Sequence, residues 1–287
     1  MPDGPSDGII SHHTAGAAVR FLLALLLAVI FLLPIYWALV ASLRQPGLPP
    51  PQTVEWWPEA ARWQNYADIF RLVPMGRYTL NSLAVVAIAV PATLITAALA
   101  GFGLSQLPDP ARRWLLIASI LVMMIPAPAI WMFRFQLLRW TGLLSSLWAL
   151  IIPAFAASSP LFVLLFFWTF RRNPQELFEA AQLDGANAVQ VWWRIALPLA
   201  RPTLAAVAVL TFVLYWNDFV GPVLYLYRPE TYTLPVGLQI LKQYDATNWP
   251  LLMAGAVFMT LPIVFLFLIL QRWFLTDRSL ANLLEKG

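Results

Sequence analysis

Six long runs without clustered charges constrain this chain more than any other feature of its sequence. The first run, residues 21–43, holds 23 uncharged residues, which would form a helix about 35 Å long. About 20 apolar residues in helix cross the core of a bilayer. The other runs are 78–108, 114–133, 140–170, 202–217 (continuing past Asp218 to 227) and 246–271. Because they are continuous rather than alternating, they predict membrane-spanning helices rather than strands.

Composition supports a lipid-embedded chain and excludes several kinds of chemistry. Apolar residues make up 60% of the chain and charged residues 11%, whereas soluble domains carry about 25% charged residues. There is no cysteine, and the only histidines, His12 and His13, precede the first run. We therefore expect no metal site, no catalytic residue and no cofactor in the apolar body. The net charge of +4 does not predict nucleic-acid binding, because the charges are few and spread between apolar runs.

Two pairs of adjacent arginines predict the orientation. Six spans put both termini on one side, and the pairs Arg112-Arg113 and Arg171-Arg172 then share that side. Because basic residues favour cytoplasmic loops, we expect both termini in the cytoplasm. The first run is too long for a signal-peptide core and predicts a retained anchor. We expect an N-terminal segment at 1–20, a first span at 21–43 and an external loop at 44–77. A core at 78–272 and a cytoplasmic tail at 273–287 follow.

Prolines lie within nearly every predicted span, and two interpretations stay open. They are Pro34, Pro91, Pro126, Pro128, Pro153, Pro160 and Pro262. Neighbouring helices satisfy the freed carbonyls of kinked membrane helices, so simple kinking is one interpretation. Broken helices around a translocation path are the other.

Two predicted external loops are rich in aromatic residues. In the loop 45–77, tryptophans favour a belt at the membrane surface, and residues 65–70 predict a short surface helix. The loop 221–250 holds Tyr225, Tyr227, Tyr232, Tyr244 and Trp249. Interface anchoring and contact with a carbohydrate or a partner protein both fit that pattern.

The loop 171–201 predicts two short capped helices. Asn173, Pro174 and Glu176 indicate an N-cap, an N1 proline and a capping box. Asp184-Gly185 predicts a left-handed stop. Asn187 and Gln190 repeat the capping pattern, and Pro198 is expected to end the second helix. The apolar residues of this loop need a cover, from the chain itself or from another protein: Leu177, Phe178, Val189, Trp192, Trp193 and Ile195.

Several motifs together resemble a known family. The loop carries Glu179-Ala180-Ala181, Asp184-Gly185-Ala186 and Ile195-Ala196-Leu197-Pro198, a pattern that resembles the EAA loop of binding-protein-dependent ABC importer permeases. Other pieces resemble the carbohydrate-uptake branch, the maltose-permease-like second subunit: Asn65-Tyr66, Asn81-Ser82-Leu83, Trp216-Asn217-Asp218-Phe219, 233–238 and Gln271-Arg272. The tail differs from the family pattern, because no glycine precedes Lys286-Gly287 in 276–285.

The resemblance implies an all-α integral membrane protein of six spans with the type I importer fold, located in a bacterial cytoplasmic membrane. The implied function is the non-catalytic pore subunit of an ATP-driven importer for a sugar. The implied partners are a second, different permease chain, an external solute-binding protein and two cytoplasmic ATPases that bind ATP and Mg. The residues implied to couple to the ATPases are Glu179, Ala180, Ala181, Asp184, Gly185, Ile195, Leu197 and Pro198.

Charged and polar residues at the ends of the runs give further hypotheses. Trp216, Asn217 and Asp218 would offer stacking and hydrogen bonds to a sugar, and an interhelical hydrogen bond is the alternative. Arg134 either reaches the membrane surface or attracts an anionic solute. An ion-coupled secondary transporter or channel is the alternative function, but the runs hold almost none of the charges such carriers place at mid-membrane.

Overall fold

The computed structural model of the chain describes residues 7–47, 55–156, 159–245 and 247–275, and within these ranges every regular element is helical. The chain divides into two compact units. Unit 1 comprises Met1–Leu72 and Leu241–Phe258, and unit 2 comprises Val73–Ile240 and Met259–Gly287. Residues 1–6 of the predicted N-terminal segment (1–20) and residues 276–287 of the predicted tail (273–287) lie outside the described residues.

The predicted all-helical membrane fold is confirmed. Among the residues that the structure describes, four helical segments are long and apolar enough to cross a membrane, and the number rises to six when each of two bent helix pairs counts as one span. The four are Val19–Ser42, Met75–Gln106, Trp148–Arg172 and Trp249–Arg272. One bent pair, Asp109–Met123 with Ala127–Trp140, covers the third run of the sequence. The other joins the loop helix Ala188–Leu199 to Arg201–Trp216, which covers the fifth run.

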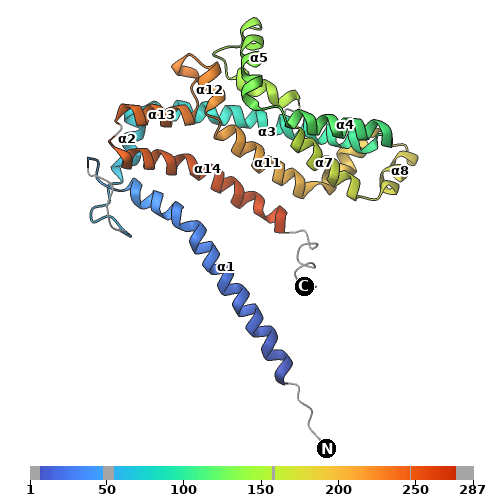
Figure 1. Ribbon diagram of the computed structural model, residues 1–287, viewed down its shortest axis with the longest axis horizontal. Helices are drawn as coiled ribbons and strands as arrows, with labels where there is room; N and C mark the ends of the chain where they lie inside the picture. The colour runs from blue at the N-terminus through green and yellow to red at the C-terminus, as the bar shows by residue number, and fades with distance from the viewer. Residues whose placement is uncertain (1–6, 48–54, 157–158, 246, 276–287) are drawn as a thin grey trace, which may run out of the picture. The chain divides into compact units, whose positions relative to one another are not determined.

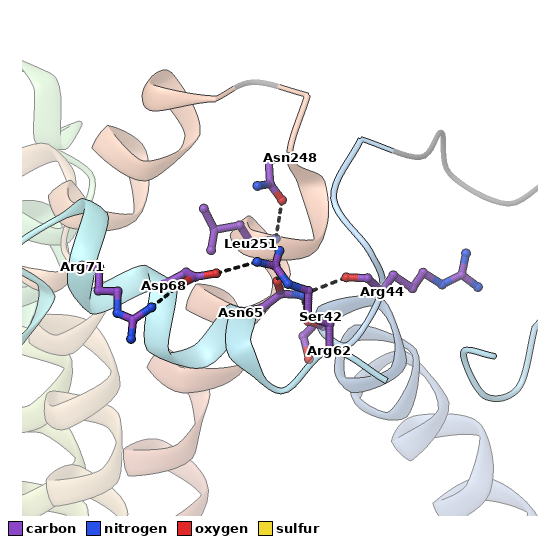
Figure 2. A network of polar contacts seen from close by, with 8 residues as sticks. All are labelled: Ser42, Arg44, Arg62, Asn65, Asp68, Arg71, Asn248 and Leu251. Atoms are coloured by element: carbon purple, nitrogen blue, oxygen red, sulfur yellow. Dashed lines mark hydrogen bonds and ion pairs between the residues drawn. The ribbon is translucent and has the colours of Figure 1, made fainter. Parts of the chain in front are cut away.

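Unit 1 joins the end of helix α1 (Asp7–Ser42) to a short helix, α2 (Gln64–Leu72), where a surface helix was expected. The link is the buried side chain of Asn65, whose Nδ2 donates hydrogen bonds to the carbonyls of Ser42, at 2.8 Å, and Arg44, at 2.9 Å (Figure 2). Carbonyls at a helix C-terminus lack partners within the helix, so this amide replaces water there.

Arginines complete the polar network of unit 1. Arg62 donates to the Asn65 side chain at 3.2 Å and pairs with Asp68 at 3.0 Å (Figure 2). The Arg44 guanidinium pairs with Glu55 at 2.8 Å and lies over the rings of Trp37 and Trp249. Asn65 is therefore held in the orientation that its two donor bonds require.

Unit 2 is built around α3 (Met75–Gln106), which packs against α7 (Pro160–Arg172), α11 (Arg201–Trp216) and a 3-10 segment, η1 (Ile152–Ala156). Gly101 allows the closest approach. A Cβ added there would lie 2.7 Å from the Phe166 Cβ and 2.9 Å from the Phe167 nitrogen. The backbones of α3 and α7 are therefore as close as a glycine permits.

The third predicted span is bent rather than straight. Helix α4 (Asp109–Met123) and helix α5 (Ala127–Trp140) meet at 91°, and Figure 1 shows α5 standing away from α4. Pro126, which precedes α5, has an extended backbone with ψ 134°. Proline has no N–H to continue the helix, and it disfavours a helical backbone at the residue before it.

The prolines differ in whether the helix continues through them. Pro34, Pro91 and Pro262 lie inside α1, α3 and α14 (Trp249–Leu275). In the fourth run, Pro153 lies in η1 after α6 (Trp148–Ile151), and Pro160 begins α7. Prolines therefore lie inside three continuous helices and at the breaks of two other spans, and a role of these breaks in a translocation path stays a prediction.

The remaining helices of unit 2 lie toward its two ends. Helix α8 (Gln175–Leu183) is at the opposite end from α12 (Val220–Tyr225), as Figure 1 shows. The second part of the loop consists of α9 (Ala188–Val191), a π-turn at Trp192–Ala196 and α10 (Leu197–Leu199). After α12 come a 3-10 turn (Pro229–Thr231) and α13 (Leu234–Tyr244).

Candidate functional site

The first helix of the loop 173–198 begins one residue later than its sequence indicated. Helix α8 starts at Gln175, and no side chain caps it. The Asn173 side chain instead donates to the Thr169 carbonyl at 3.1 Å, one of the carbonyls left unpaired at the end of α7. The expected capping box of Asn173 and Glu176 is therefore wrong, because the preceding helix end takes the asparagine.

The turn after α8 has the predicted left-handed glycine. Gly185 has φ +89°, and its N–H donates to the Gln182 carbonyl at 3.0 Å. The Ala186 N–H reaches back to the Ala181 carbonyl, also at 3.0 Å. These two bonds close the end of α8 and reverse the chain, as glycine-terminated helices commonly do.

The second helix starts as predicted and ends later. Asn187 and Gln190 form the expected capping box, with both hydrogen bonds at 2.9 Å. The helix does not end before Pro198, because Leu197 keeps a helical backbone, with φ −64° and ψ −44°. A π-turn at Trp192–Ala196 precedes this proline and gives its ring more room than a regular helix would. The break comes at Ala200, where the chain bends by 83° into α11.

The apolar residues of the loop divide between two faces. One face is buried in a core of unit 2 that includes Phe102, Phe166 and Phe170. The residues that enter this core are Phe178, Val191, Trp192 and Ala196, with Ala181, Ile195 and Leu197 packed at its edge. The other face is exposed: Leu183 is 89% exposed, Val189 66% and Trp193 60%. The chain itself therefore covers only half of the apolar surface that the sequence indicated.

The eight residues predicted for ATPase coupling follow the same division. Those that are exposed are Glu179, Ala180, Asp184, Gly185 and Pro198. Those at the edge of the core are Ala181, Ile195 and Leu197. The structure thus brings all eight onto one helix pair, whose inner face is anchored and whose outer face is free in this chain.

The predicted solute-path residues lie at the end of α11 and differ in accessibility. Trp216 is fully buried, and its indole Nε1 donates to the Met259 carbonyl at 2.9 Å. Asn217 is exposed, and its side chain donates to the Val213 carbonyl one turn earlier. Asp218 lies in the break before α12 and accepts a hydrogen bond of 3.0 Å from the Gly221 N–H. Of the three, Asn217 has the most accessible side chain.

Arg134 points into unit 2 rather than outward to the membrane surface. Its Nη2 donates to the Ala149 carbonyl at 2.6 Å, and its guanidinium lies 4.8 Å from the centre of the Tyr225 ring. Tyr225 is buried, so it is not an interface anchor. The expectation that Arg134 reaches the surface is wrong, because a carbonyl and a ring face stabilise its charge inside the protein.

Two motifs that the sequence analysis noted separately prove to contact each other. The Asn81 side chain donates to the carbonyls of Glu230 and Tyr232, both at 2.8 Å. The neighbouring Ser82 hydroxyl accepts from the Leu234 N–H at 2.9 Å. The start of α3 therefore holds the segment 230–234, a link between distant parts of the chain that no local pattern indicates.

In the part of the chain that the structure describes, no group of three or more acidic or histidine side chains is placed to hold a metal ion. Among the described residues, up to six apolar spans and an anchored helix pair before α11 define a multi-pass membrane protein. Residues 94–278 match the model of the family described as "Binding-protein-dependent transport system inner membrane component". The chain belongs to this family, whose members are non-catalytic membrane components of transporters.

Relatives of known role are similar over most of their length. The sulfoquinovosyl glycerol transport system permease protein SmoH of Agrobacterium fabrum is 29% identical over 262 residues, which cover 91% of this chain and 92% of SmoH. The arabinooligosaccharides transport system permease protein AraQ of Halalkalibacterium halodurans is 32% identical over 202 residues, covering 70% and 72%.

A solved structure has the same fold. It is a chain of a bacterial ABC transporter involved in the import of the acidic polysaccharide alginate. The two chains superpose with a TM-score of 0.74 at 22% identity, over 96% of this chain and 100% of that one. The likeness shows that the two chains share a fold over nearly their whole lengths.

Proposed function

We propose that this chain is the pore-forming subunit of an ATP-driven importer that takes up a sugar or a related carbohydrate. The family membership supports a transport role. The names of the relatives support the solute class, since SmoH and AraQ belong to systems for a sugar glycoside and for oligosaccharides. The fold shared with the alginate importer agrees with that class.

The observation that carries the proposal is the divided surface of the loop 173–198. An apolar face as exposed as that of Leu183, Val189 and Trp193 indicates a protein contact, because monomeric proteins rarely leave such patches uncovered. The loop lies outside the apolar runs, which supports a soluble partner rather than lipid. We infer that two cytoplasmic ATPases, which bind ATP and Mg, are docked in the complex and that one of them covers this face.

Coupling follows from the opposite face of the same helices. Phe178 and Trp192 are fixed in the core that also holds α3 and α7, so a displacement of α8 is transmitted to the spans. The ATPases would favour one of two arrangements of the spans through their different contacts with each, which is the requirement for driven alternating access. Glu179, Ala180 and Asp184 would contact the ATPase directly, with Gly185 setting the turn.

The proposed complex contains a second, different permease chain and an external solute-binding protein. The chain would lie in a bacterial cytoplasmic membrane with both termini inside. The family description as an inner membrane component supports the location, and the arginine pairs Arg112-Arg113 and Arg171-Arg172 support the orientation.

We propose further that Asn217 and Asp218 border the solute path, with Trp216 holding them in place. Asn217 is exposed in this chain, and an amide is a suitable hydrogen-bond partner for sugar hydroxyls. Trp216, which is buried and bonded to Met259, would act through position rather than through stacking on the sugar.

Co-purification and uptake test the proposal. The substitution Leu183→Asp puts a charge on the exposed face and should abolish both ATPase co-purification and ATP-dependent uptake in proteoliposomes with the binding protein. The neighbouring Gln182→Asp, also at an exposed position, is the matched control and should retain more of both. Uptake driven by an ion gradient without the ATPases would contradict the proposal and favour a secondary transporter.

A further inference from the structure

A groove of about 280 Å³ lies between α7 and α11 and has no role in the function proposed above. Leu165, Trp168, Thr169 and Arg172 form one wall, and Pro202, Thr203 and Ala206 form the other. The four residues of α7 stand at positions i, i+3, i+4 and i+7, so they lie on one face of that helix. The groove is therefore a continuous furrow along two helices.

A hydroxyl pair closes the floor of the groove. The hydroxyls of Thr169 and Thr203 are 2.7 Å apart, and the Thr169 hydroxyl also donates to the Leu165 carbonyl at 2.9 Å. The Thr203 hydroxyl is therefore the donor in the pair. Its oxygen retains a lone pair that can accept a bond from a ligand.

The groove spans the level at which the apolar run ends. The run 140–170 gives way to Arg171 and Arg172 in the last turn of α7. A basic residue directly after a membrane span marks the boundary between hydrocarbon and water. Arg172 therefore lies at the boundary, whereas Leu165 lies two turns deeper, among the acyl chains.

The charge at the mouth of the groove is uncompensated. Across the described ranges, neither Arg172 nor its neighbours Arg171 and Arg201 form an ion pair, and all three are exposed. The lining of the groove contains no acidic residue. The charge of Arg172 at the mouth of the groove therefore favours an anion, and the apolar walls deeper in the groove favour an apolar chain.

We propose that the groove binds an anionic glycerophospholipid. The phosphate contacts the Arg172 guanidinium through charge-assisted hydrogen bonds, the glycerol region reaches the Thr203 hydroxyl, and an acyl chain lies along Leu165, Trp168 and Ala206. Basic pockets between membrane helices bind acidic headgroups in this manner. Only the assignment to the inner leaflet rests on the proposed orientation.

Two features favour a whole lipid over a free anion or a protein segment. A free phosphate would leave the apolar walls of Leu165, Pro202 and Ala206 unoccupied. A protein segment would have to supply both an acid at the membrane boundary and an apolar chain in the hydrocarbon, a combination that every anionic lipid already has. Arg172 also stabilises the C-terminus of α7 through the helix dipole, but Arg171 does so equally and is not among the residues that line this groove.

Native mass spectrometry of the full-length chain, purified with the subunits that accompany it, tests the proposal. The probes are phosphatidylglycerol and phosphatidylcholine in equal amounts. We expect preferential retention of phosphatidylglycerol, and a loss of about fivefold in its affinity in Arg172→Gln, as the removal of one basic residue near a membrane surface predicts. Arg171→Gln is the matched control, and its effect should be smaller than about twofold because Arg171 does not line this groove.

A second variant tests the walls without changing any charge. Ala206→Leu narrows the groove and should weaken retention of phosphatidylglycerol while leaving the complex assembled, which size-exclusion chromatography checks. Equal losses in Arg171→Gln and Arg172→Gln would overturn the proposal, because they would indicate diffuse attraction. Three other results would overturn the proposal as well. Ala206→Leu could retain phosphatidylglycerol unchanged, or millimolar inorganic phosphate could displace the lipid. The lipid could also be retained only after the second permease subunit is removed.

Discussion

The ring of Phe178 meets the ring of Phe102 edge to face, with centroids 5.7 Å apart and planes at 89°. Phe178 belongs to α8 and Phe102 to α3, so this contact joins the loop helix directly to the central span of unit 2. Edge-to-face pairs stabilise beyond the area they bury. The contact fixes the position of α8 relative to the span to which it would transmit motion.

Loss of that contact should detach α8. Phe178→Ala removes a fully buried ring at a cost of about 3–5 kcal/mol, which is large for a helix of nine residues. We expect faster protease cleavage within 173–198 and ATP hydrolysis uncoupled from uptake. Leu177→Ala, at the adjacent and partly exposed position, is the control and should be cleaved almost as slowly as the unchanged chain. Equal cleavage of both variants would contradict the anchoring role of Phe178.

Two glycines of α3 make a matched pair for the packing of α3 on α7. A Cβ at Gly101 would meet the backbone of α7 at 2.9 Å, whereas a Cβ at Gly103 would meet nothing within 4 Å. Gly101→Ala should therefore push the helices apart and lower the thermal stability of the purified protein. Gly103→Ala should preserve or slightly raise it, since alanine is the better helix former. Thermal melts in the same detergent compare the two variants. Similar melting temperatures would show that the close approach of α3 and α7 at Gly101 does not contribute to stability.

Substitution of Gly185 should act through backbone conformation alone. A side chain there would meet no atom within 4 Å, but its φ is +89°. A residue other than glycine costs about 1–2 kcal/mol in such a conformation, and asparagine tolerates it better than valine. We expect normal membrane levels in both variants, with weak ATPase co-purification and lost uptake in Gly185→Val and a milder defect in Gly185→Asn. Full uptake by Gly185→Val would remove the argument for a left-handed hinge.

Substitutions of Trp216 and Asn217 should distinguish a structural role from direct contact with the solute. Trp216→Phe removes the hydrogen bond to the Met259 carbonyl. Hydrogen bonds between membrane helices contribute about 0.6 kcal/mol on average. We therefore expect a small loss of stability and a correspondingly small loss of uptake. Asn217→Ala should leave assembly intact and reduce uptake more strongly. Measuring the apparent affinity for solute together with complex yield distinguishes the two variants. Failure of Asn217→Ala to assemble would favour a structural role instead.

The spans could be predicted because the hydrocarbon core imposes a length and polarity that a single sequence displays. The turn at Gly185 and the cap at Asn187 could also be predicted, since each depends on residues within one helical turn. Asn173 has the same local pattern as Asn187 but bonds to Thr169 instead. What decides its partner is the nearby end of α7, which competes for the same side chain.

The bends could not be predicted for a related physical reason. A proline removes one hydrogen bond wherever it stands, and the neighbouring structure determines whether the helix continues. Pro91 lies inside a helix packed on three elements, whereas Pro126 precedes a right-angled bend in a pair of helices that are largely exposed. The direction of Arg134 likewise depends on the distant Ala149 and Tyr225.

The hydrogen bonds from the Asn81 side chain to the carbonyls of Glu230 and Tyr232 limit when this part of the chain can fold during its synthesis. Its partners follow Asn81 by 149 and 151 residues, an interval of about 8–30 s at the usual rate of synthesis of 5–20 residues per second. The Asn81 amide and the Ser82 hydroxyl cannot form these bonds until the segment 230–234 has been made. This edge of the bundle must therefore stay open until synthesis has passed the fifth span, and only then can the start of α3 bond to the segment 230–234.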